Sequence, residues 1–241
     1  MWYKLKRIMI RPNGVEKQVR PSGWQPWANT IAYYPLTSTT TNDDRSGNGY
    51  DMTLHNNPIF WTAYWVDCMK CYWSDWNWGW NWLYTTSLST SSLWNSFSIW
   101  YWGLLETSSF IWVFSARSHP RNWITAAIEL ASVTTEILNN WTINRIRYAW
   151  TITKNVWHYV LTTYDNWAWN LYYDWQLVAT WNYNIGSAPY ISIWVYLSDW
   201  TPTWYIYACN GYISNVILED KVRTAQEVAD YCDQTKANYG L

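Results

Sequence analysis

The chain has 241 residues, a formal net charge of −1 and charged side chains at only 14% of its positions. This length suits one all-β domain with a substantial core, and the near-neutral charge leaves no footprint for nucleic-acid binding over the whole chain. No run reaches the roughly 18 apolar residues of a membrane span. No signal peptide is visible, since the apolar stretch Ile8–Ile10 is too short for one.

Residues 1–28 are expected to form a basic hairpin and a linker. The first 20 residues hold six Lys and Arg against one Glu, and Arg11-Pro12-Asn13-Gly14 has the composition of a turn between residues 3–10 and 15–19. Residues 21–26, PSGWQP, are rich in chain breakers. The segment is either a solvated edge hairpin or an attachment segment.

Strand-like runs then follow at short spacing and predict two packed antiparallel sheets. They are rich in Val, Ile, Thr, Tyr and Phe, and turn signals separate them without an intervening helical pattern. The clearest are residues 29–36, 83–88, 97–102, 110–115, 124–130, 156–164, 171–173, 176–180, 190–197 and 212–218. Many short strands of this kind indicate an all-β sandwich or jelly roll.

One helix is predicted near the end of the chain, over residues 224–236. Thr224-Ala225-Gln226-Glu227 is a capping box. In such a box the Thr hydroxyl accepts a hydrogen bond from the backbone amide of Glu227, and the Glu227 carboxylate accepts one from the backbone amide of Thr224. The apolar residues that follow have the i, i+3, i+4, i+7 spacing of one helical face. We expect this helix to pack against the sandwich.

The tryptophans stand where glycines are usual. The chain has 25 Trp and only 9 Gly, and eight of the Trp follow Asn or Asp, as Gly does in hairpin turns. Asp174-Trp175 falls at the tip of a predicted hairpin, where a type I′ turn needs φ > 0 at both central residues. We interpret most of these Trp as glycines encoded by UGA and read as tryptophan. The alternative is a protein that is truly rich in Trp. Trp157 and Trp102 suit core positions and are taken as genuine. We therefore expect Trp157 to be buried and Trp175 to be exposed with positive φ, and we expect the same exposed geometry at several of Trp76, Trp78, Trp123, Trp167 and Trp200.

Several stretches resemble the laminin-G-like, concanavalin A-like jelly-roll family once glycine is restored. They are IAYYPL…NDDRSGNGYDMTL from residue 31, VWHYVLTTYDNWAWNLYYDWQLVATW over 156–181, and GYISNVILEDKVRTAQEVADY over 211–231. The resemblance implies one jelly-roll β-sandwich with a short C-terminal helix over residues 29–241. Asn215 departs from the Asp that is frequent in the family's closing strand.

The carboxylates do not fit a hydrolase of the same fold. Such enzymes carry two Glu in an E-x-D-x-x-E spacing on one strand face, and no two of the six Glu here share it. Glu219 and Asp220 are adjacent, so their side chains point to opposite faces of a strand. No G-x-S-x-G elbow is present. We therefore predict no catalytic residues.

A calcium site is expected in the polar loop that spans residues 42–49. Carboxylate and backbone oxygens in tight turns suit a hard cation, with Asp44 as the best ligand and Asp43 and Asn42 next. The alternative is a solvated Asx-rich turn.

The function that these features and the resemblance imply is non-catalytic. We expect a carbohydrate-binding or adhesive module, extracellular, cell-surface or virion-associated, whose partner is a glycan or surface glycoconjugate. One alternative is a structural or receptor-binding component of a phage tail, fibre or surface assembly, anchored by the basic N-terminal segment. A second alternative is a glycoside hydrolase. Neither nucleic acid nor a membrane span is expected.

Overall fold

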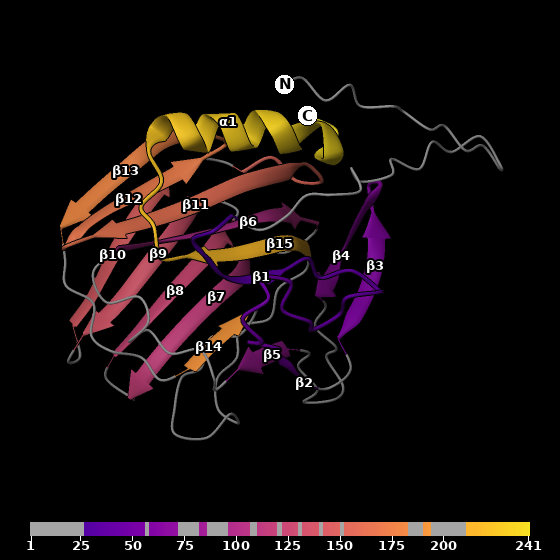
Figure 1. The fold of residues 1–241 in the computed structure, drawn as a ribbon. Helices are drawn as coiled ribbons and strands as arrows, with labels where there is room; N and C mark the ends of the chain where they lie inside the picture. Colours follow the sequence, from indigo (N-terminus) through magenta and orange to yellow (C-terminus); the bar gives the residue numbers. More distant parts are fainter. Residues whose placement is uncertain are drawn as a thin grey trace, which may run out of the picture.

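The computed structural model describes residues 27–55, 58–71, 82–85, 96–106, 110–119, 122–129, 132–139, 142–149, 152–182, 190–193 and 211–241. The predicted N-terminal hairpin lies outside these residues. The described chain forms two antiparallel sheets and one short C-terminal helix (Figure 1). The predicted all-β jelly-roll sandwich with a C-terminal helix is therefore confirmed.

The larger sheet has eight strands in the order β13-β12-β11-β6-β15-β4-β3, with β1 also paired to β15. The strands are β1 (Thr30–Tyr34), β3 (Ile59–Ala63), β4 (Val66–Cys71), β6 (Ser96–Leu105), β11 (Trp157–Asp165), β12 (Ala168–Tyr173), β13 (Gln176–Asn182) and β15 (Gly211–Glu219). The first and last described strands thus meet near the centre of this sheet, as a jelly-roll topology requires.

The smaller sheet has seven strands in the order β10-β9-β8-β7-β14-β5-β2. They are β2 (Thr53–His55), β5 (Trp82–Thr85), β7 (Phe110–His119), β8 (Asn122–Glu129), β9 (Ser132–Asn139), β10 (Thr142–Ala149) and β14 (Tyr190–Ile193). Residues 132–149 were not among the clearest predicted strands. Their Thr and Ile content and alternation are nevertheless typical of the strand hairpin that they form.

Side chains from both sheets meet in the core between them. Along β6, Phe97, Ile99 and Tyr101 point into this core, where they join Val133 of β9 and Ile146 of β10. A buried hydrogen bond, 2.9 Å between the hydroxyls of Thr135 and Thr162, also crosses from β9 to β11. The period of two along a strand places the intervening residues of β6 on the opposite face of the same sheet.

That opposite face is buried beneath the helix. Helix α1 (Ala225–Thr235) and the 3-10 helix η2 (Lys236–Tyr239) follow the predicted capping box, which forms at Thr224 and Glu227. Trp100 and Trp102 of β6 and Trp157 of β11 pack there against residues of both helices. Figure 1 shows α1 lying along the outer side of the larger sheet. No helix among the described residues is long and apolar enough to cross a membrane.

Strand β15 contains a one-residue bulge at Asn215. Asn215 has φ = 52°, and the pairing with β6 shifts between Ser214 and Ile217. Its side-chain oxygen accepts a hydrogen bond from the Tyr33 hydroxyl at 2.9 Å, and its amide donates to the hydroxyl of Tyr239. Asn215, where the resembled family has Asp, thus connects β1, β15 and η2.

Three two-residue hairpins carry Trp at a positive-φ position. Trp65 (φ = 73°), Trp167 (89°) and Trp175 (64°) each follow a residue that also has positive φ. All three side chains are exposed, at 58%, 57% and 41% of their surface, whereas Trp157 is only 1% exposed. The geometry predicted for Trp175, Trp167 and Trp157 is therefore confirmed.

The same prediction is wrong for Trp123. Asn122 and Trp123 belong to β8 and pair with His119 and Arg117 of β7, so they do not form the turn that the Asn-Trp dipeptide indicated. The β7–β8 ladder therefore extends further along the chain than the dipeptide predicts. Trp76, Trp78 and Trp200 lie outside the described residues.

Candidate functional site

Asp44, the best predicted calcium ligand, is the centre of the loop at residues 42–49. Its Oδ1 accepts hydrogen bonds from the amides of Tyr33 (2.9 Å) and Ser46 (2.8 Å). Its Oδ2 accepts from the Ser46 hydroxyl (2.7 Å) and the Tyr50 amide (3.0 Å). A carboxylate has about four lone-pair sites, so these four donors use its whole capacity. Asp44 fixes the loop against β1, and its oxygens offer no free position for a cation.

The other two predicted ligands have different partners. Asn42 donates to the carbonyl oxygen of Met52 at 2.5 Å, and Asp43 forms an exposed ion pair with Arg45 at 2.9 Å. Among the described residues, no group of three or more His, Cys, Asp or Glu side chains is placed to hold a metal ion. Calcium binding at this loop stays a prediction, and of the three predicted ligands Asp43 has the exposed carboxylate.

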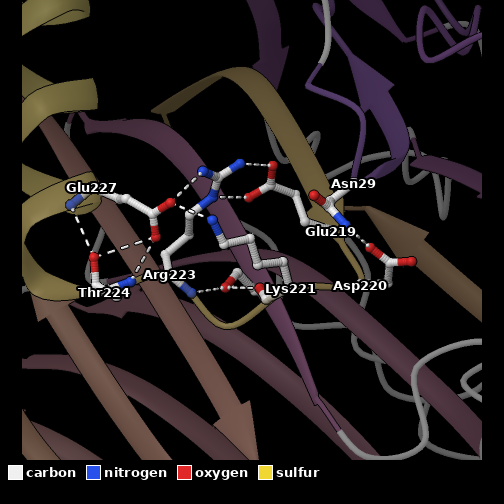
Figure 2. Close-up of polar contacts among 8 residues, drawn as sticks. Asn29, Glu219, Asp220, Lys221, Arg223, Thr224 and Glu227 are labelled. Carbon is white, nitrogen blue, oxygen red and sulfur yellow. Dashed lines mark hydrogen bonds and ion pairs between the residues drawn. The ribbon is translucent and has the colours of Figure 1, made fainter.

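A buried carboxylate lies where β15 leads into α1 (Figure 2). The Glu219 side chain is 0% exposed, and both of its oxygens bind the guanidinium of Arg223. Burial raises the pKa of Glu219 above its ordinary value, and the contact with Arg223 opposes that shift. Asp220, the next residue, is exposed and accepts a hydrogen bond from Asn29. The two carboxylates therefore have different surroundings, and Asp220 lies just beyond the end of β15.

Glu227 joins the same network from the first turn of α1. Burial opposes its ionisation, but hydrogen bonds from Lys221 and from the backbone of Thr224 hold the pKa of Glu227 at about 2. Ser98 of β6 anchors the connecting segment, since its hydroxyl donates to the Lys221 carbonyl at 2.6 Å and accepts from the Arg223 amide at 3.0 Å. These carboxylates fasten the helix to the sheet, and neither is free to act as a catalytic acid or base.

His158 fixes the hairpin between β12 and β13. Its Nε2 donates to the carbonyl oxygen of Thr153 at 3.0 Å, and its Nδ1 lies 2.9 Å from Asp174 and 2.6 Å from the Tyr173 hydroxyl. Asp174 also accepts from the Tyr159 amide at 2.9 Å. Both ring nitrogens of this buried imidazole are therefore engaged within the fold.

One end of the outer face of the larger sheet remains open. The register of β6, β11, β12 and β13 aligns outward-facing side chains in two rows, because paired residues of antiparallel strands share a face. Ser98, Thr163, Asn170 and Thr180 form one row, and Ser96, Asp165, Ala168 and Asn182 form the other. We define the polar patch as Ser96, Asp165, Asn170, Thr180 and Asn182, the polar members that reach solvent.

The polar patch has unused hydrogen-bonding capacity. Asp165 Oδ1 accepts from the Ser96 hydroxyl (2.8 Å) and from Asn166 (3.0 Å), while no described residue donates to its Oδ2. Asn170 donates to Thr163 at 3.2 Å, and its side-chain oxygen has no partner among the described residues. In Figure 1, β13 ends on the side of the larger sheet from which the chain leaves β15 for α1. The polar patch is the candidate functional site.

The fold resembles botulinum neurotoxin binding domains. The serotype C1 binding domain aligns with a TM-score of 0.68 at 14% identity, over 86% of this chain and 52% of that one. A type C structure, described with the dependence of cell entry on two ganglioside molecules, gives 0.66 at 13%, over 86% and 51%. The type DC binding domain in complex with rat synaptotagmin II gives 0.67 at 14%, over 86% and 51%.

The likeness shows the fold alone, because the sequence identities are this low. This chain spans about half the length of those binding domains. No protein-family model matches the sequence, and no curated protein matches it.

The polar patch was missed by the sequence reasoning. Its members come from four strands, and Ser96 and Asp165 are 69 residues apart. Alternation along each strand indicated which residues share a face, but not which strands are neighbours. The one available signal was the lack of Lys, Arg and Glu in residues 166–182, since exposed edge strands commonly carry charge.

Proposed function

We propose that this chain is a non-catalytic recognition module that binds carbohydrate on the outer face of its larger sheet. The observation that carries the proposal is the polar patch, which is open, rich in hydroxyl and amide groups and placed on a rigid sheet. Sugars present hydroxyls that both donate and accept hydrogen bonds, and the patch offers both kinds of group.

Two further observations support a binding role over a catalytic one. Of the glutamates whose side chains the structure describes, Glu219 and Glu227 pair with cations where β15 leads into α1, and Glu106 lies 3.8 Å from Lys70. The solved structures with a similar fold are described as binding domains, and one is described with ganglioside molecules. An extracellular, cell-surface or virion location would suit such a module.

The experiment is a glycan array probed with the full 241-residue chain, followed by calorimetry on the strongest ligand. Saturable binding of an oligosaccharide is the expected result. No binding to any glycan, together with co-purification in virus particles, would favour the alternative of a structural or receptor-binding component anchored by the basic N-terminal segment. Release of reducing sugar, lost on mutation of one Glu, would favour a glycoside hydrolase instead.

We also propose that Trp65, Trp167 and Trp175 stand where the natural protein has glycine, through UGA codons read as tryptophan. Their φ values of 64–89° resemble those of Gly47, Gly49 and Gly240, which are 77–91°. A side chain in this region costs about 1–2 kcal/mol per residue. The proposal does not extend to the buried Trp100 and Trp169, since neither has a positive φ that requires glycine.

A further inference from the structure

We infer that the polar patch selects neutral glycans and rejects sialylated or otherwise anionic ones. This inference rests on the proposed function, because it concerns the same surface. Its basis is the charge distribution over the patch and over the segment that borders it.

Asp165 is the one ionisable member of the patch. It lies at the end of β11 and is exposed, and its Oδ1 is held by Ser96 and Asn166. Those two hydrogen bonds fix the carboxylate on the outer face with Oδ2 open to a ligand. A sugar hydroxyl can donate to this oxygen, and hydrogen bonds to a charged acceptor are stronger than neutral ones. A ligand carboxylate cannot donate, and it would be repelled.

The cations that border the patch are already paired. Lys221 and Arg223 belong to the segment that Ser98 anchors at the edge of the patch. Lys221 binds Glu227, and Arg223 binds both Glu219 and Glu227, as Figure 2 shows. An anionic sugar would therefore find no free positive charge on this segment to offset Asp165. An uncompensated like charge is a common way of excluding a competing ligand.

The extent of the polar patch across the strands suits a short oligosaccharide. Adjacent strands lie about 4.8 Å apart, so four strands spread the patch over about 14 Å. Ser98 and Thr163, which share a row with Asn170 and Thr180, are fully buried, so the exposed members of that row adjoin packed structure. Asn170, Thr180 and Asn182 add amide and hydroxyl groups that carry no charge. We expect the ligand to lie across the strands, with Asp165 binding one of its hydroxyls.

The test compares matched pairs of neutral and α-sialylated oligosaccharides on an array and then by calorimetry. Asp165→Ala should weaken binding of the neutral ligand by about tenfold or more. Asp165→Asn removes the charge and keeps the shape, so it should strengthen binding of the sialylated partner by about fivefold. Asp67→Asn, which removes an exposed charge from β4 on the far side of the larger sheet, is the matched control and should change neither. Thr180→Ala and Asn182→Ala, on the exposed edge strand, test the patch without disturbing any hydrogen bond among the described residues.

The outcomes separate this inference from the proposed function. Preference of the wild type for the sialylated partner would overturn the selectivity and leave carbohydrate recognition intact. Binding of neutral ligand that all the patch variants retain would overturn the patch as its site and place recognition elsewhere on the chain. Binding of no glycan at all would overturn both.

Discussion

Glu219 and Arg223 form a buried ion pair in which the guanidinium binds both carboxylate oxygens, one of them through Nε at 2.6 Å. The pair joins the last residue of β15 to the segment that caps α1. Trp27 stacks on Trp100 beneath the helix, and the Arg223 guanidinium lies 4.0 Å from the Trp27 ring. This buried charged contact, with the Trp27 ring against its guanidinium, is therefore one of the contacts that attach the helix to the sheet.

Arg223→Ala should destabilise the protein strongly, because it leaves the Glu219 carboxylate buried without a partner. Breaking such a pair costs about 3–5 kcal/mol, which urea unfolding followed by Trp fluorescence can measure. Arg45→Ala is the matched control, since its pair with Asp43 is exposed and should contribute at most about 1 kcal/mol. Equal losses in the two variants would contradict the central role of the buried pair.

The capping box should give the protein a specific sensitivity to acid. The pKa of Glu227 is lowered from 4.5 to about 2 in the folded chain, so its stabilisation is present above pH 4.5 and is lost as the pH falls toward 2. The free energy of unfolding should therefore fall over this range, and less so in Glu227→Gln. The raised pKa of Glu219 changes the free energy of unfolding in the opposite direction, but it does so in both the wild type and Glu227→Gln. The difference between the two pH profiles therefore reports Glu227. Parallel pH profiles would contradict this assignment.

Asp44→Ala should destabilise the domain by at least about 2 kcal/mol. It removes the carboxylate that accepts four hydrogen bonds, two from Ser46 and one each from the amides of Tyr33 and Tyr50. Asp44→Asn should cost less, since its amide oxygen can keep two of the four hydrogen bonds. Thermal unfolding of both variants beside Asp43→Ala gives the comparison. An Asp44→Ala protein as stable as the Asp43 variant would mean that the carboxylate does not organise the loop.

Calcium binding at the loop of residues 42–49 is tested by titration calorimetry on the wild type, Asp43→Ala and Asp44→Ala. If a cation binds, the exposed Asp43 should contribute, and removing its side chain should reduce the heat. Equal heats in the wild type and Asp43→Ala, or none in either, would remove this site.

Replacing Trp65, Trp167 and Trp175 by Gly should stabilise the protein, because glycine adopts positive φ without steric cost. The gain should be about 1–2 kcal/mol per site. Trp157→Gly is the control. It empties a buried position and should cost about 3–5 kcal/mol or more. Chemical unfolding of the single variants measures both effects, and destabilisation by all three turn substitutions would contradict the strain argument.

Mass spectrometry of the natural protein decides the identity of these residues directly. A peptide that contains position 175 should be lighter than the printed sequence requires, by the difference between a Trp and a Gly residue at each replaced site. A peptide of the full expected mass, with Trp175 and Trp181 intact, would end the recoding proposal and leave the excess of Trp after Asn and Asp without an account.

Features that depend on near neighbours in the chain were predictable from the amino-acid sequence. Alternating apolar residues predicted most strands, Thr224 and Glu227 predicted the start of the helix, and Asp174-Trp175 predicted a turn with positive φ. Each of these patterns lies within a few residues, because hydrogen bonding and backbone sterics act over that range. The failure at Asn122-Trp123 has the same origin, since a dipeptide signal carries no information about how far the β7–β8 ladder extends.

Contacts between residues that are distant in the chain depend on the tertiary structure. Asp44 and Tyr50 are predictable as a polar loop, but the donation from Tyr33 that completes the carboxylate's hydrogen bonds depends on how β1 is placed. The polar patch depends on the order β6-β11-β12-β13 and on their register. Strand order and register are set by long-range pairing and by burial of both faces of the larger sheet, and neither is encoded in the spacing along any single strand.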